Sequence, residues 1–187
     1  MTISLQVPSE ATSETFSRAM EALGAHPDQP RNQRAFRYLP PFRKLVLSRI
    51  AAQRAELAAA TPVGWQYFIS DSLGAAVIDL SDKILDTFSS VRRGAFAERY
   101  ENVLKSIEAD RGAAAANYRA EVLEIPQIGT CAVMARESYD VWFYPVCLNG
   151  KISELSFLSE HEFFASVPKP QRSPDNESGN EPSGPVI

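Results

Sequence analysis

The chain has 187 residues, of which 44% are hydrophobic and 22% are charged, and its formal net charge is −4. These values are typical of a globular protein with one domain and tails, and no apolar run approaches the span of about 20 residues that a bilayer requires. The N-terminus has neither the basic start nor the apolar stretch of a secretory signal. We therefore expect a cytoplasmic protein in which Cys131 and Cys147 are reduced thiols rather than a disulfide.

The first third of the chain predicts helices. We expect residues 1–12 to be disordered, followed by a helix over 13–23 that Ser13 caps. A proline-containing linker over 26–33 leads to a second helix over 41–60, because proline is favoured in the first turn of a helix and an apolar stripe follows it.

Strands dominate the rest of the chain. The aromatic and β-branched segments 65–69 and 75–80 are predicted to pair. Apolar residues then recur at helical spacing within a helical region over 83–111. The strands predicted after that region are 118–125, 130–136, 140–148 and 151–158. Asn149 and Gly150 lie between the last two and predict a two-residue hairpin turn, because both residues tolerate a positive φ.

The strand 140–148 decides the expected architecture, because its side chains are apolar on both faces and both faces need cover. We predict an α+β fold with a single antiparallel sheet of five or six strands, preceded by N-terminal helices. Helices within 83–111 would cover one face and the 41–60 helix would lie near the other. Residues 159–167 are expected to form a helical turn or a strand extension. The predicted divisions are a disordered N-terminus (1–12), an N-terminal helical region (13–60), an α+β domain (61–167) and a disordered C-terminal tail (168–187).

Three segments of the predicted domain share a pattern with a known family. They are Gly74–Ser81 (GAAVIDLS), Tyr100–Val103 (YENV) and Tyr144–Val146 (YPV) with Asn149-Gly150. Together they resemble the small single-domain PAS-like families of alphaproteobacteria over about residues 63–158. The resemblance implies an antiparallel sheet with helices inserted after its second strand, and a sensory role. A roadblock-like or profilin-like module has a similar element order and stays an alternative.

No motif in the sequence predicts catalysis or metal binding. His26 lies in the linker, and the neighbours of His161 point to different sides of a strand or helix, so ligands do not converge there. The chain has no P-loop, dinucleotide fingerprint or nucleophile elbow. Haem-binding PAS proteins use a histidine on the helix that lines the cavity, and the helix over 91–111 contains none. The photoreactive flavin-binding relatives carry a cysteine within an Asn-Cys-Arg helical motif, and Cys131 lacks those neighbours. We therefore expect no cofactor and no enzyme activity.

Polar-tipped aromatic residues are the better candidates for a binding site, since small-molecule pockets are mostly apolar with a few placed polar groups. Packing in the core explains any one of them equally well. The candidate pocket residues are Trp65, Tyr67, Phe96, Tyr100, Trp142 and Tyr144. With the PAS-like resemblance, they predict a non-catalytic sensory or regulatory module that binds a small ligand or a protein partner.

A basic segment supports an alternative function. Residues 31–54 contain seven bases and no acid, whereas all 23 acids lie elsewhere in the chain. A regulator that binds nucleic acid would use Arg43, Lys44 and Arg49 on phosphates. A solvated helix face with intramolecular ion pairs is the competing interpretation.

The short first helix predicts a partner. A helix over 13–23 is too short to be stable alone and must dock the face that carries Phe16, Met20 and Leu23. We expect a homodimer through residues 13–60, in which a second subunit supplies that surface. The alternative is that the helix folds back onto its own domain.

Overall fold

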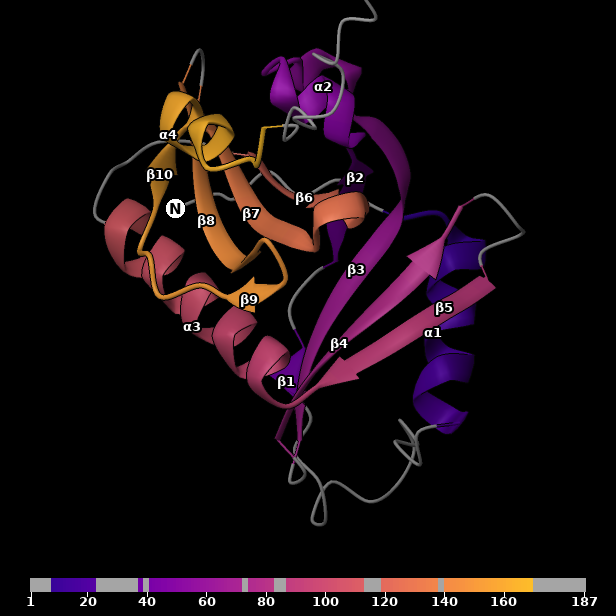
Figure 1. Ribbon diagram of the computed structural model, residues 1–187. Helices are drawn as coiled ribbons and strands as arrows, with labels where there is room; N and C mark the ends of the chain where they lie inside the picture. The colour runs from indigo at the N-terminus through magenta and orange to yellow at the C-terminus, as the bar shows by residue number, and fades with distance from the viewer. Residues whose placement is uncertain are drawn as a thin grey trace, which may run out of the picture.

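A computed structural model describes residues 8–22, 37–38, 41–71, 74–82, 87–112, 119–137 and 140–169. They form one mixed sheet with helices on both faces (Figure 1). The strands are β1 (Arg37–Tyr38), β2 (Phe42–Val46), β3 (Thr61–Asp71), β4 (Gly74–Ser81), β5 (Thr87–Arg93), β6 (Arg119–Ile125), β7 (Thr130–Glu137), β8 (Asp140–Leu148), β9 (Lys151–Ile152) and β10 (Leu158–Ser159). The helices are α1 (Glu10–Ala22), α2 (Arg49–Gln53), α3 (Ala95–Gly112) and α4 (Glu160–Ala165), with short 3₁₀ turns at Leu57–Ala59 and Pro126–Ile128.

The sheet consists of two antiparallel halves joined by one parallel pair. Its order is β10-β8-β7-β6-β2-β3-β4-β5, while β1 pairs with β3 and β9 pairs with β8. Strands β2 and β6 run parallel at the junction, and the other neighbours are antiparallel. Helix α3 makes the long connection from the edge strand β5 back to β6 in the middle of the sheet.

The predicted fold class is therefore wrong in three respects: the number of strands, the purely antiparallel pairing and the N-terminal helices. Residues 41–60 form β2 and the short α2 instead of one long helix, and residues 87–93 form β5 instead of helix. Strand β2 lies between β3 and β6, and it buries Phe42 on the concave face and Leu45 on the convex face, so it lacks the alternation that marks a half-buried strand. Ile50, within the segment that was predicted as one amphipathic helix, is 63% exposed.

The concave face of the curled sheet wraps around α3. Buried residues of β2, β3, β4, β6, β7 and β8 pack there against four side chains of the helix, which are Ala97, Tyr100, Val103 and Ile107. The curl has a local cause at Gly64 in β3, where an added Cβ would lie 1.9 Å from the carbonyl oxygen of Leu80. Only glycine permits this close approach of β3 to β4, so Gly64 is needed for the bend.

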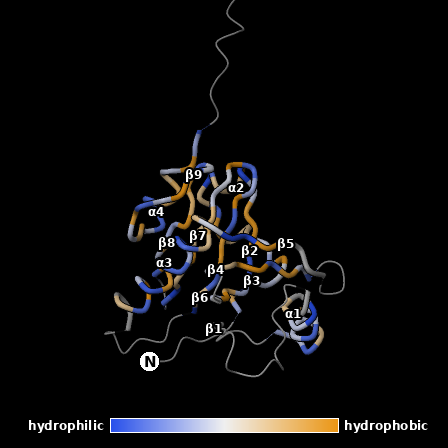
Figure 2. Tube along the Cα trace, turned by 90° about the horizontal axis from the view of Figure 1, so that it is seen from below, coloured by the Kyte–Doolittle hydropathy of each residue, from blue (hydrophilic) through white to orange (hydrophobic). Residues whose placement is uncertain are grey.

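Two separate groups of elements cover the convex face. Over β6, β7 and β8, residues of α2 and α4 complete a cluster in which Phe163 stacks on Phe143 at 4.2 Å between ring centroids. Over β3 and β4, α1 covers a second cluster with Met20 and Phe16, and Phe16 stacks on Tyr67 at 4.0 Å. Helix α1 lies apart from the other helices in a second view of the chain (Figure 2). Met20 and Phe16 of the predicted docking face thus pack on the chain's own sheet, whereas Leu23 lies outside the described residues, and the homodimer stays a prediction.

Several local predictions are confirmed. The segments 65–69 and 75–80 lie in β3 and β4, and 118–125, 130–136 and 140–148 match β6, β7 and β8 closely. Asn149 and Gly150 have φ values of 52° and 78° in the two-residue hairpin that joins β8 to β9. The segment that follows Ser159 is helical, and α3 ends near Gly112 as the pattern indicates.

Other local predictions need correction or lie outside the described residues. The first helix begins earlier than expected, because Ser9 rather than Ser13 accepts the hydrogen bond from the backbone N–H of Thr12. The predicted strand 151–158 is reduced to its two ends, β9 and β10. The linker 26–33 with His26 and the tail from residue 170 lie outside the described residues. No described helix is long and apolar enough to cross a membrane.

Candidate functional site

Four charged side chains on the concave face form a closed ring of ion pairs, called the charged ring below. Lys44 Nζ lies 3.1 Å from Asp79 Oδ1 and 2.8 Å from Glu124 Oε2. Arg92 Nη2 lies 2.9 Å from Asp79 Oδ2 and 2.7 Å from Glu124 Oε1. Each cation therefore contacts both carboxylates, and the formal charges of the ring sum to zero.

The ring exists only because the sheet is strongly curled. Arg92 belongs to β5 and Glu124 to β6, and these strands are four positions apart in the sheet order. In a flat sheet such strands lie about 19 Å from each other, at about 4.8 Å per step. An arginine and a glutamate cannot reach across that distance, so the 2.7 Å contact closes the open side of the half-barrel.

Irregular strand pairing occurs beside three residues of this region. The register shifts between Lys44 and Leu45 in the β2–β3 pair, and between Asp79 and Leu80 in the β4–β5 pair. A third shift follows Cys131 in the β7–β8 pair, and Cys131 is the strand partner of Glu124. Such bulges bend a strand and re-aim its side chains. They direct these residues toward a common region of the concave face.

Asp79 is the centre of the hydrogen bonding. Besides its two cations it accepts a hydrogen bond from Gln66 Nε2 at 2.7 Å and another from Ser90 Oγ at 2.8 Å. The guanidinium of Arg92 also lies 4.1 Å from the ring centroid of Phe96 in α3, within the range of a cation–π contact. The charged ring is thus tied to β3, to β5 and to the start of α3.

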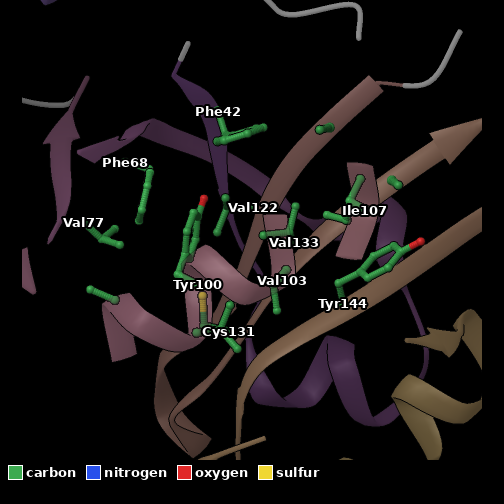
Figure 3. Close-up of a cluster of buried hydrophobic side chains, with 14 of the residues drawn as sticks. Phe42, Phe68, Val77, Tyr100, Val103, Ile107, Val122, Cys131, Val133 and Tyr144 are labelled. Atoms are coloured by element: carbon green, nitrogen blue, oxygen red, sulfur yellow. The ribbon is translucent and has the colours of Figure 1, made fainter. Parts of the chain in front are cut away.

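Some buried polar atoms in and near the ring have no partner. Four buried side-chain polar atoms of the described residues lack a hydrogen bond; one belongs to Arg49 in α2, and the others are Tyr100 Oη, Gln66 Oε1 and Arg92 Nε. Tyr100 and Gln66 are both 0% exposed. Figure 3 shows the ring of Tyr100 between Phe68 and Val122, with Cys131 close by. Buried polar atoms of this kind cost about 1–3 kcal/mol each when left unpaired, so such a cluster indicates a site.

The pKa shifts of the surrounding groups fix their protonation states at neutral pH. Burial alone would raise the pKa of Asp79, but Arg92 and Lys44 outweigh it and lower that pKa, so Asp79 stays ionised at neutral pH. Burial raises the pKa of both Tyr100 and Cys131 well above their usual values. The phenol and thiol are therefore neutral, and this arrangement has neither an activated nucleophile nor a carboxyl poised for proton transfer.

The six aromatic candidates do not form one pocket. Trp65 and Tyr67 lie on the convex face under α1, whereas the other four contact the concave cluster. Of these, Phe96 and Tyr100 lie beside the charged ring. Tyr144 is in a different part of the cluster from Tyr100 (Figure 3), and Trp142 packs at 5.4 Å against Phe157. Only Phe96 and Tyr100 of the predicted set thus belong to the site described above.

The basic candidates are likewise separated. Arg43 pairs with Asp82 at 2.5 Å and lies over the ring of Trp65 at 4.9 Å. Lys44 is on the opposite face in the charged ring, and Arg49 begins α2. Ion pairs occupy two of the three, so this arrangement adds no support for the nucleic-acid alternative. His161 lies on α4, and the described residues contain no group of side chains that suits a metal ion.

Sequence reasoning missed Gln66, Asp79, Arg92 and Glu124. A signal was present, because Asp79 interrupts the otherwise apolar run Ala75–Leu80 and Glu124 lies between Leu123 and Ile125. Polar residues in such positions are expected to be paired when buried. Their partners come from strands distant in the sequence, and that pairing is not visible in a local pattern.

Comparisons with known proteins give no relative for this chain. No family model, no curated protein and no solved structure matches it. They therefore neither support nor oppose the PAS-like resemblance.

Proposed function

We propose that this protein is a non-catalytic regulatory module that binds a small ligand at the charged ring on its concave face. The observation that carries the proposal is that three unpartnered buried atoms, Tyr100 Oη, Gln66 Oε1 and Arg92 Nε, belong to residues in or next to a neutral ring of ion pairs. A bound molecule would satisfy these atoms and recover their desolvation cost.

The electrostatics support binding without chemistry. The ionised carboxylate of Asp79 is held by two cations, and the neighbouring phenol and thiol are neutral because burial raises the pKa of each. Such groups orient a ligand but do not activate it. The ring also connects β2, β4, β5 and β6, so a ligand there would favour the curled form of the sheet. A partner that binds the curled form and a more open form with different affinities would then respond to whether the ligand is bound.

Native mass spectrometry of the purified full-length chain tests the proposal. We expect a stoichiometric small molecule bound to the protein, and we expect Tyr100→Phe to raise its dissociation constant about fivefold, measured as loss of occupancy on dilution, since one hydrogen bond is worth about 1 kcal/mol. Tyr144→Phe is the matched control, because Tyr144 is also fully buried in the same cluster but lies apart from the ring.

Two results would contradict the proposal. One is equal occupancy in the Tyr100→Phe and Tyr144→Phe variants, which would place the ligand elsewhere. The other is a hydrolase or transferase activity that one substitution in the ring abolishes, because the ring would then take part in a reaction.

A further inference from the structure

We infer that Cys131 and Cys147 form a redox site, at which a low-molecular-weight disulfide oxidises two thiols to one reversible disulfide between β7 and β8. Both cysteines are free thiols in the structure, and the chain contains no other cysteine. The pair lies next to the charged ring in the sheet, because Cys131 is also the strand partner of Glu124. The inference does not depend on a ligand at that ring, since it concerns the β7–β8 pair alone.

The two cysteines are direct neighbours across an antiparallel pair of strands. Cys131 of β7 lies opposite Cys147 of β8 in the strand register. Residues opposite each other in such a pair have Cα atoms about 4.5–5.5 Å apart. This separation lies within the range of roughly 4.4–6.8 Å that a disulfide spans. The pairing of the strands therefore holds the two residues at a distance that a disulfide can bridge.

A bulge in β8 turns both thiols to the same face of the sheet. Val146 belongs to the concave cluster, so regular alternation would place its neighbour Cys147 on the convex face. After the cysteine pair, however, Ala132 pairs with Pro145, and Val146 is an extra residue. Cys147 consequently packs against the concave cluster, to which Cys131 also belongs.

The thiol of Cys147 reaches toward the neighbouring strand. Its Sγ donates to the carbonyl oxygen of Gly129, the residue directly before β7, at 3.3 Å. Burial raises the pKa of Cys147, and a hydrogen bond with the backbone of Cys131 opposes that rise. The sulfur of Cys147 thus already contacts the backbone of the residue with which it would form the bond.

The two thiols differ in their access to a reagent, and this difference sets the order of the reaction. Cys131 is 2% exposed, whereas Cys147 is half-buried. Cys147 therefore attacks first: it loses its proton, its sulfur bonds to one sulfur of the oxidant, the S–S bond of the oxidant breaks and a thiolate leaves. Cys131 then loses its proton and attacks Cys147 Sγ, which expels the second thiolate. Each cysteine sulfur loses one electron, each sulfur of the oxidant gains one, and the two protons go to the departing thiolates.

The same geometry makes the second step feasible and the product reducible. Burial raises the pKa of Cys131 well above its usual value, so little of this thiol is ionised. Its attack is intramolecular, however, and a high effective concentration compensates for the small ionised fraction. Opposite Cβ atoms lie about 4.5–5.5 Å apart, whereas a disulfide needs about 3.8 Å, so the strands must approach as the bond forms. Because strained disulfides are easily reduced, the bond suits a switch better than a permanent crosslink.

Intact-mass spectrometry of the full-length chain in glutathione buffers tests the inference. With oxidised glutathione, we expect each chain to lose two hydrogen atoms and to carry no glutathione. A reduced-to-oxidised ratio of about 100 should restore both thiols, because the bond is strained.

Single variants check the order of attack. Cys131→Ser should stop the reaction after its first step, with one glutathione on Cys147, and Cys131→Ala gives the same test if the serine variant does not fold. Cys147→Ser should react with glutathione at least about tenfold more slowly than Cys131→Ser, because its remaining thiol is buried.

A double variant, Cys147→Ser with Leu148→Cys, is the matched control. It moves the thiol by one residue to the convex face, where Leu148 packs. We expect no disulfide in the folded double variant. After unfolding in urea, the double variant and the parent chain should close their disulfides at similar rates, since the two loops have nearly the same length. The comparison separates the geometry of the strands from the chemistry of the thiols.

Four results would overturn the inference. They are a folded parent chain in which neither thiol reacts, one that stops at the glutathione adduct, a disulfide between two chains instead of within one, and a folded double variant that closes as fast as the parent. A bond that persists in the reducing buffer would overturn its role as a switch. None of these results bears on the ligand of the charged ring, which native mass spectrometry tests separately.

Discussion

At the scale of the residue, Tyr100 combines complete burial with a hydroxyl that has no partner. We predict that Tyr100→Phe leaves the ligand-free protein as stable as before or stabilises it by about 1 kcal/mol, because a buried hydroxyl without a partner is removed. Tyr100→Ala should cost about 3–5 kcal/mol through the cavity that it creates. Urea unfolding measures both free energies. A loss above about 1 kcal/mol in Tyr100→Phe would show that the hydroxyl has a partner in the folded protein.

Gly64 is the second residue on which the fold depends. An added Cβ would lie 1.9 Å from the backbone oxygen of Leu80, and backbone atoms in the middle of a sheet cannot move away easily. We predict that Gly64→Ala destabilises the protein by more than about 3 kcal/mol or prevents folding. Gly150→Ala is the control, because that position is sterically open and only its φ of +78° is unfavourable, at about 1–2 kcal/mol. Equal losses in thermal unfolding would refute this role for Gly64.

At the scale of the element, α4 depends on its first turn. The hydroxyl of Ser159 accepts from the backbone N–H of Glu162, and the Glu162 carboxylate accepts from the backbone N–H of Ser159. We predict that Ser159→Ala costs about 1 kcal/mol, because the first turn loses a cap. Ser156→Ala, in the exposed loop before β10, should change stability by less than about 0.5 kcal/mol. Chemical denaturation of the two variants compares them, and indistinguishable midpoints would argue against the cap.

Helix α1 depends on tertiary contact rather than on its own propensity. Phe16 stacks on Tyr67, whereas Arg18 on the same helix has an exposed side chain and only a weak 3.8 Å pair with Glu14. We predict that Phe16→Ala costs about 2 kcal/mol and shifts the fluorescence of Trp65 to the red, because α1 loosens from the convex face. Arg18→Ala should leave both observables unchanged within about 0.5 kcal/mol. An unchanged spectrum in Phe16→Ala would mean that α1 does not hold Trp65 out of water.

At the scale of the whole molecule, the charged ring couples folding to pH. Burial would raise the pKa of Asp79, but Arg92 and Lys44 lower it below its ordinary value of 3.8 in the folded state. The unfolded chain therefore binds the proton more tightly. Asp79 contributes stability above about pH 4, and this contribution is lost as the pH falls below that value.

We accordingly predict that the free energy of unfolding declines below about pH 4, and that Asp79→Asn has a lower stability at pH 7 with a weaker dependence on acid pH. Urea titrations between about pH 2 and pH 7 measure the slopes. The exposed Asp140, substituted by Asn, is the matched control and should keep the slope of the parent protein. An Asp79→Asn variant with the parental slope would show that the ring does not govern the acid response.

The parts of the structure that could be predicted are those in which the local sequence pattern is compatible with only one kind of secondary structure. The β6, β7 and β8 strands, the Asn149-Gly150 hairpin and the helix around Tyr100 follow from turn chemistry and from periodicity within about ten residues of chain. The 41–60 segment fails for the opposite reason. A strand buried on both faces and an amphipathic helix can have the same sequence pattern when the apolar residues stand three and four positions apart. In this segment, only the pairing with β3 and β6 decides that the chain forms a strand.

Composition, five of the longer strands (β3, β4, β6, β7 and β8) and the lack of reactive motifs came from the sequence by itself, and so did the two aromatic residues, Phe96 and Tyr100, that lie at the site. The tertiary structure decided the sheet order, the curl and the charged ring. Lys44 and Glu124 are eighty positions apart in the chain, and they meet because a parallel pair places β2 beside β6 and a curled sheet brings β5 around to both. Contacts of this kind have no local signature, because their energy depends on which strands are neighbours and not on which residues are adjacent in the chain.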